Sequence, residues 1–238
     1  MIRSTRPNGS LGVSANAETF TWPHLFWILA AGGLGWVTSF VFGNVLQMSR
    51  YLFVGVYSAI VISFLVAYFG RLRLSTAAYF KRHLWLGLIG ACVLSLIMVM
   101  GVVRQTRSIP PAGLELAPAL LWLGLVYGVV DAMLLTVMPV LAIYELFETV
   151  SRSAGTARYV FRPAAAMTAS LFVTGAYHWG YAEFQGGTIV QPLIGNAIIT
   201  LGYLLTANPL TPIVAHVAMH IAAVLWGIET TVQLPPHY

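Results

Sequence analysis

Charge is scarce in this sequence of 238 residues, since only 8% of them are Asp, Glu, Lys or Arg while 58% are hydrophobic. The mean hydropathy is +0.81, far above that of a soluble domain. Apolar runs of about 20 residues recur, each long enough to cross a hydrocarbon core of about 30 Å. The short segments of alternating polarity that are typical of a membrane β-barrel are lacking. The sequence therefore predicts an all-α, polytopic helical membrane protein.

Cysteine and lysine are almost absent, with one residue of each, Cys92 and Lys81. A single cysteine excludes an internal disulfide. Lys81 falls in a polar loop, so a Schiff base to a buried retinal is unsupported. The polar residues 1–22 lack the apolar core of a secretory signal peptide. We expect them to form a cytoplasmic N-terminal segment, followed by one transmembrane domain over 23–230 and a short tail over 231–238.

Seven apolar runs are candidate membrane spans. They cover residues 23–46, 51–70, 83–103, 117–147, 164–184, 193–207 and 211–228. The fourth run, extended to Arg152, would measure about 50 Å as a single helix, which is longer than the hydrocarbon core. Pro139 lies inside it and should kink or break it. Seven spans are therefore expected, or eight if the run around Pro139 is two spans, and a break would reverse the orientation of the later spans.

The basic residues favour one orientation. With seven spans and a cytoplasmic N-terminus, only Arg50, Arg104 and Arg107 of the twelve basic residues fall outside. This distribution fits the positive-inside rule. Because the basic residues lie between spans, they argue for membrane orientation and against a nucleic-acid partner. We expect an integral protein among membrane lipids, in the inner (cytoplasmic) membrane if the source is bacterial.

Ionisable side chains within the apolar runs are costly to bury and are therefore candidate functional residues. They are Asp131, Glu145, Glu148, His178, His216 and His220, with Arg152 at the end of the fourth run. Glu145, Glu148 and Arg152 share one helical stripe, although Glu148 with Arg152 also fits a plain salt bridge. Asp131 either forms a hydrogen bond to a neighbouring span or stays protonated.

The three histidines differ in how strongly their sequence context indicates a functional role. His216 and His220 are four residues apart, so they project from one face of a helix, about 6 Å apart along its axis. Both must find partners in a dry setting, which favours a functional pair. His178 lies between Tyr177 and Trp179, a setting that is also typical of an interfacial aromatic belt.

The stretch GYLLTANPLTPIVAHVAMHIAAVL, which begins at Gly202, resembles the last motif of the CAAX-protease and bacteriocin-processing membrane proteins. His216 matches the histidine of that motif, and His220 stands in place of its asparagine. The run that ends at His178 is similar to the family's Phe-x-x-x-His motif, with Thr174 in place of phenylalanine.

The family's first motif, Glu-Glu-x-x-x-Arg, is matched in part by Glu148 and Arg152, while Phe147 replaces the first glutamate. Glu145, one turn earlier, is a substitute on the same face. The resemblance spans residues 139–228 and implies an intramembrane protease core. It implies hydrolysis of membrane-bound, prenylated or otherwise processed peptides by water that glutamate and histidine activate.

The resemblance implies a set of catalytic residues, namely Glu145, Glu148, Arg152, His178, His216 and His220. The histidines His178, His216 and His220 would also make an adequate Zn²⁺ shell. The sequence HVAMH lacks the glutamate of the soluble H-E-x-x-H zinc motif, so zinc stays an open alternative.

The expected depths of these residues differ. Glu145 falls near the cytoplasmic end of its span, His216 about 8 Å inside and His178 about 21 Å along its helix, so convergence requires tilt or a break at Pro139. Two other functions stay open. One is a non-catalytic member of the same fold that acts as a structural or assembly subunit of a larger membrane complex. The other is a subunit whose histidines each ligate haem or a chlorophyll-type pigment.

Overall fold

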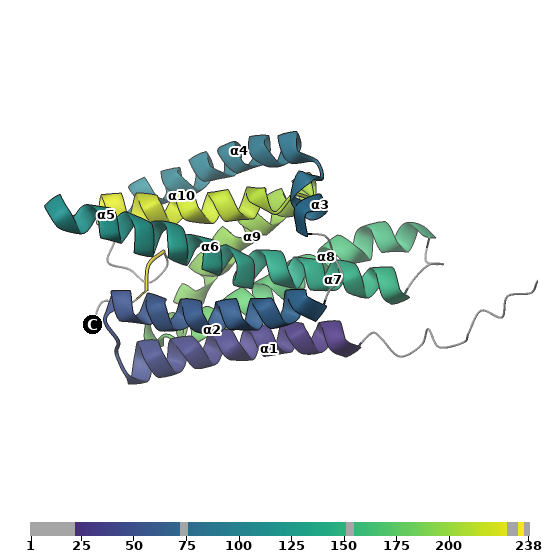
Figure 1. Ribbon diagram of the computed structural model, residues 1–238, viewed down its shortest axis with the longest axis horizontal. Helices are drawn as coiled ribbons and strands as arrows, with labels where there is room; N and C mark the ends of the chain where they lie inside the picture. Colours follow the sequence, from purple (N-terminus) through teal and green to yellow (C-terminus); the bar gives the residue numbers. More distant parts are fainter. Residues whose placement is uncertain (1–21, 72–75, 151–154, 228–232, 236–238) are drawn as a thin grey trace, which may run out of the picture.

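The structure, a computed structural model, describes residues 22–71, 76–150, 155–227 and 233–235. These residues form a bundle of long helices with no strand among them, as Figure 1 shows, so the all-α prediction is confirmed. Five of the described helices are long and apolar enough to cross a membrane. Their bounds are Pro23–Val45, Arg50–Arg71, Leu84–Val103, Gly113–Glu148 and Gly187–Thr206.

The first half of the chain supplies two edges of the bundle. Helix α1 (Trp22–Thr38) continues into the π-helical turn η1 (Ser39–Val45), and a tight hairpin leads to α2 (Arg50–Arg71). The short α3 (Thr76–Lys81) then precedes α4 (Leu84–Val103). Helices α1 and α2 lie along one edge of the bundle and α4 lies along the opposite edge (Figure 1).

The second half supplies the helices that carry the histidines. Helix α8 (Gly155–Trp179) is followed by the 3₁₀ turns η5 (Ala182–Phe184) and η6 (Gly187–Ile189). Helices α9 (Val190–Thr206) and α10 (Leu210–Trp226) complete it. Helix α10 packs against α4 and α9, and α8 packs against α1 and α9. The observed helices follow the expected apolar runs, although α8 begins before the expected residue 164 and ends at Trp179, before the expected residue 184.

One continuous helix occupies residues 113–150. Its consecutive segments are η2 (Gly113–Glu115), α5 (Leu116–Ala119), η3 (Leu120–Val126), α6 (Tyr127–Ala132), η4 (Met133–Val137) and α7 (Met138–Val150). Pro139 does not end this helix, so of the expected kink or break the break is not observed. The eight-span alternative depended on that break and therefore loses its support.

The helix continues past Pro139 because a neighbouring helix replaces the hydrogen bond that proline removes. Proline has no amide hydrogen, so it leaves the carbonyl of Leu135, four residues earlier, without its usual helical partner. The Ser170 hydroxyl of α8 donates to that carbonyl at 2.7 Å. The π-helical turn η4 just before Pro139 is a second adjustment that membrane helices use to accommodate proline.

The outer surface of the bundle is apolar. Large hydrophobic side chains that are each more than 60% exposed lie on α1, α2, α4 and α9, which is the reverse of a soluble surface. They include Phe26, Leu29, Val66, Ile89, Leu96 and Leu205. This apolar surface suits insertion in a membrane.

Glycine allows the long helix to approach α10 closely. A Cβ atom added to Gly128 would lie 2.8 Å from the Cα atom of Val217, a separation that real side chains do not show. The same Cβ atom would lie 3.1 Å from Cδ2 of His220. The two helices run in opposite directions here, since Gly124 faces Ile221 where Gly128 faces Val217. The close approach therefore places the ring of His220 against the long helix, one turn before Asp131.

Replacing Ser170 with Ala should destabilise the protein by about 1 kcal/mol or more, because a buried carbonyl loses its donor. In a Pro139→Ala background the Leu135 carbonyl regains a helical amide, so the same serine replacement should cost less. Unfolding titrations in mixed micelles measure both effects. Ser63→Ala is the matched control, since the Ser63 hydroxyl donates at 2.7 Å to the carbonyl of Ala59 at an exposed position. Equal costs in the two backgrounds would contradict the explanation.

Candidate functional site

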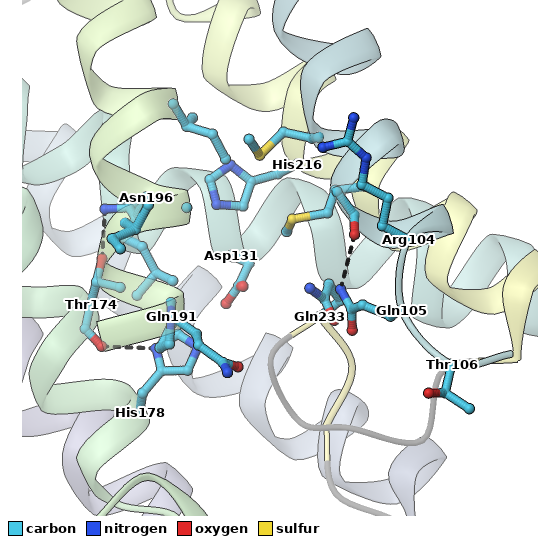
Figure 2. Close-up of a pocket in the computed structure, with 18 of the residues that line it drawn as sticks. Arg104, Gln105, Thr106, Asp131, Thr174, His178, Gln191, Asn196, His216 and Gln233 are labelled. Atoms are coloured by element: carbon cyan, nitrogen blue, oxygen red, sulfur yellow. Dashed lines mark hydrogen bonds between the residues drawn. The ribbon is translucent and has the colours of Figure 1, made fainter. Parts of the chain in front are cut away.

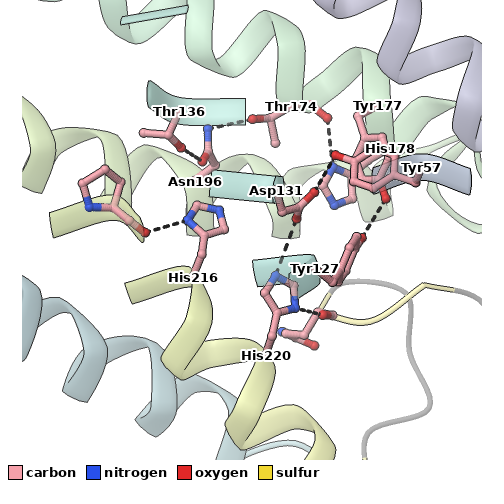
Figure 3. A network of polar contacts seen from close by, with 12 residues as sticks. Tyr57, Tyr127, Asp131, Thr136, Thr174, Tyr177, His178, Asn196, His216 and His220 are labelled. Carbon is pink, nitrogen blue, oxygen red and sulfur yellow. Dashed lines mark hydrogen bonds and ion pairs between the residues drawn. The ribbon is translucent and has the colours of Figure 1, made fainter. Parts of the chain in front are cut away.

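Three histidines and one aspartate meet inside the bundle (Figure 3). His216 and His220 come from α10, His178 from the end of α8 and Asp131 from α6. Each is at most 5% exposed. The rings of His216 and His220 lie 6.2 Å apart, centroid to centroid, so the prediction that they share a face is confirmed.

Backbone carbonyl groups fix the tautomer of all three rings. Nδ1 of His178 lies 2.9 Å from the carbonyl oxygen of Thr174, and Nδ1 of His216 lies 3.0 Å from that of Pro212. Nδ1 of His220 contacts the carbonyl oxygen of Gln233. Because a carbonyl oxygen can only accept, Nδ1 must carry the proton in each case. In the neutral ring Nε2 is then the nitrogen that can accept a proton.

Asp131 is held from two sides. The Tyr57 hydroxyl of α2 donates to Oδ1 at 2.9 Å, and Nε2 of His220 lies 3.6 Å from Oδ2. The first contact is the hydrogen bond to a neighbouring span that was one of the two alternatives for Asp131. Since Nδ1 of His220 already donates to Gln233, the ring and the carboxylate attract each other only if they share a second proton.

A cavity of about 830 Å³ opens beside this cluster (Figure 2), which is a size typical of ligand sites. Asp131, His178 and His216 line it, whereas His220, which is not part of the lining, faces Asp131. The lining also includes the exposed residues Arg104, Thr106 and Gln191, where α4 ends and α9 begins. The cavity therefore connects buried ionisable groups with one end of the bundle.

A second polar network supports the wall that carries His178. The Asn196 side-chain amide donates to the hydroxyls of Ser170 at 2.9 Å and Thr174 at 2.7 Å, and its oxygen accepts from Thr136 at 2.7 Å. The carbonyl of Thr174 in turn accepts from His178. Because these groups satisfy one another in an apolar interior, they hold α8, α9 and the long helix in register.

Tyrosines surround the other side of the cluster. The hydroxyls of Tyr127, Tyr177 and Tyr181 form a chain, with oxygen separations of 2.7 and 2.8 Å. The ring of Tyr127 packs 4.7 Å from the ring of His220. These side chains are buried, so they shape the site by packing and limit the directions in which His220 can turn.

The two glutamates do not join the histidines, which corrects the expected convergence. Glu145 is fourteen residues beyond Asp131 on the same helix, about 21 Å along its axis. Glu148 is exposed and accepts from Arg162 of α8 at 3.0 Å. Arg152 lies outside the described residues. The physical reason is the unbroken helix, since no turn at Pro139 brings Glu145 back toward the cluster.

The proposed zinc shell finds no support in the geometry. Within the described part of the chain, no three His, Cys, Asp or Glu side chains are grouped so that they could hold one metal ion. His220 points its Nε2 at Asp131, and His178 and His216 come from different helices.

Sequence reasoning missed the neutral polar residues of the site. Asn196 and Tyr57 each lie within an apolar run, and including amides and hydroxyls in the inventory of intramembrane polar groups would have selected them. Gln233 contributes through its backbone carbonyl, which no side-chain pattern reveals.

Comparison of the chain with protein-family models, with curated proteins and with solved structures finds no significant match.

Replacing Tyr57 with Phe should lower the free energy of unfolding by about 1–3 kcal/mol, because the buried carboxylate of Asp131 loses a donor. The same replacement at Tyr51, which is 45% exposed on the same helix, should change it by less than about 0.5 kcal/mol. Unfolding titrations of both variants in mixed micelles provide the measurement. If Tyr57→Phe costs no more than Tyr51→Phe, the hydrogen bond to Asp131 contributes nothing.

Proposed function

We propose that the chain is a membrane-embedded hydrolase whose acid–base groups are Asp131, His178, His216 and His220. The observation that supports this most directly is the cavity, which three of the four groups line inside an apolar bundle. General acid–base catalysis requires groups that accept and return protons next to a space large enough for substrate. The substrate class, peptides held at or in the membrane, follows from the sequence resemblance to CAAX-type proteases.

The chemistry follows from the tautomers. Nε2 of His178 or His216 takes a proton from water while the water oxygen bonds to the peptide carbonyl carbon. The resulting imidazolium is stabilised by the nearby carboxylate of Asp131. The proton then passes to the leaving amine nitrogen as the carbon–nitrogen bond breaks, which returns the histidine to its neutral form.

In this proposal the carboxylate that assists water activation is Asp131 and neither of the two glutamates. In the family that the sequence resembles, a glutamate activates the water, and Glu145 or Glu148 was the expected equivalent. Here Asp131 is the carboxylate that lies among the histidines, held by Tyr57 and His220. Asp131 therefore takes the part of the family glutamate in our proposal, and Glu148 serves in the ion pair with Arg162.

A non-catalytic role is the second candidate, and one observation favours it. The Tyr57 hydroxyl is paired with Asp131, and Asn196 is paired with its hydroxyl partners. Such mutual pairing is also what a structural or assembly subunit of a membrane complex would use to fix its helices. The hydrolase and the structural subunit differ in whether a substrate is hydrolysed in the cavity.

The proposed topology has seven spans with a cytoplasmic N-terminus. Helices α8 and α10 join the five long apolar helices, and the basic residues favour this direction. The end of the cavity at Arg104 and Gln191 then faces the outer side of the membrane, so water and substrate enter from there.

Cleavage of a pool of membrane peptides, prenylated and unmodified, by the protein in liposomes tests the hydrolase proposal. Asp131→Asn and His216→Gln should each lower turnover by about 100-fold or more, because proton transfer contributes at least that factor. Glu148→Gln should leave turnover unchanged, as should His83→Gln, an exposed histidine at the start of α4.

Turnover that survives Asp131→Asn, or that disappears in Glu148→Gln, would contradict the assignment of the carboxylate. No turnover in the wild type, together with a colourless sample, would favour the structural subunit over both the hydrolase and the pigment protein.

Cysteine labelling tests the topology, because Cys92 is the only native cysteine. In a Cys92→Ser background, Arg107→Cys should react with a membrane-impermeant maleimide on intact cells. Lys81→Cys should react only after the membrane is permeabilised. The opposite pattern would reverse the orientation and place the mouth of the cavity on the cytoplasmic side.

A further inference from the structure

His220 differs from the other two histidines in what orients its ring. His178 and His216 each donate from Nδ1 to the carbonyl four residues earlier in their own helix. His220 instead donates to the carbonyl of Gln233, thirteen residues later and beyond the end of α10. Its orientation therefore depends on a segment outside the helix that carries it.

That segment, residues 233–235, is buried in the protein. Gln233 is 7% exposed and lines the cavity, Leu234 is 2% exposed, and Pro235 is also buried. Leu234 belongs to the main hydrophobic core. The 233–235 segment is thus held in place by the burial of its side chains as well as by hydrogen bonds.

Arg50 holds the other end of the segment. The guanidinium Nε donates to the carbonyl oxygen of Pro235 at 2.6 Å, and the side chain is only 7% exposed. A buried charged group is costly unless it is well hydrogen-bonded, so this contact is a strong constraint on the segment. Arg50 is the first residue of α2, the helix that also provides Tyr57. Helix α2 therefore contacts both Asp131, through Tyr57, and the 233–235 segment that orients His220, through Arg50.

We infer that the 233–235 segment, held by Arg50, is a positioning element of the acid–base site that sets the tautomer of His220 and directs its Nε2 at Asp131. If the segment leaves, Nδ1 of His220 loses its acceptor, and the ring can adopt either tautomer. Nε2, which lies 3.6 Å from Oδ2 of Asp131, is then no longer held in its proton-accepting form. The consequence for turnover rests on the proposed function, whereas the consequence for the tautomer does not.

The test uses the full chain with ¹⁵N-labelled histidine rings in lipid nanodiscs, and a His220→Gln sample assigns the signal. In the wild type, the ring nitrogens of His220 should report a proton fixed on Nδ1. In Arg50→Gln that signal should show exchange between tautomers, and turnover should fall by about tenfold or more, as expected when an orienting partner is lost. Arg71→Gln, at the other end of α2, is the matched control and should change neither quantity.

Leu234→Ala is a second variant that loosens the segment without touching Arg50 or His220, so it should shift the tautomer signal in the same direction. A wild-type His220 with its proton on Nε2 would overturn the inference, and this result does not depend on the folding of Arg50→Gln or Leu234→Ala. So would Arg50→Gln and Leu234→Ala variants that keep the wild-type signal. If no peptide is cleaved but the tautomer shifts as expected, the positioning role stands and the hydrolase proposal fails.

Discussion

The packing of the helices around the site depends on one buried carboxylate, that of Asp131. Asp131 lies in the middle of the longest helix, where an unpaired charge would be very costly, so other elements must supply partners. Tyr57 of α2 donates to Oδ1, and His220 of α10 places its Nε2 3.6 Å from Oδ2. Gly128 lets α10 come close enough for this contact. The requirement to satisfy Asp131 thus fixes the relative positions of three helices, and Asp131 itself lines the cavity.

The remaining wall depends on a second constraint, the unbroken helix through Pro139. Ser170 replaces the hydrogen bond that the proline removes, and Asn196 donates to the same serine. Asn196 also binds Thr174, whose carbonyl orients His178. The network of Ser170, Asn196 and Thr174 therefore has two roles. It supplies the donor that the helix lacks at Pro139, and it positions His178.

The positions of the helices could be predicted from the sequence, because apolar runs of membrane length are a strong signal. The shared face of His216 and His220 could also be predicted, since it depends only on helical spacing. The expected convergence of Glu145 and Glu148 with the histidines is not observed, because a local motif match does not show which parts of the helices meet. The contact of His220 with Gln233 depends on a backbone atom of a distant segment, and no sequence pattern encodes it.

The most direct test of the account is the coupling between Asp131 and His220. Unfolding free energies of Asp131→Asn, His220→Gln and the double variant, measured in mixed micelles, form a double-mutant cycle. If the two side chains form one buried pair, the double variant should cost less than the sum of the single variants by about 1 kcal/mol or more. Additive costs, within about 0.5 kcal/mol, would show that the pair is not coupled and would contradict the account of the site.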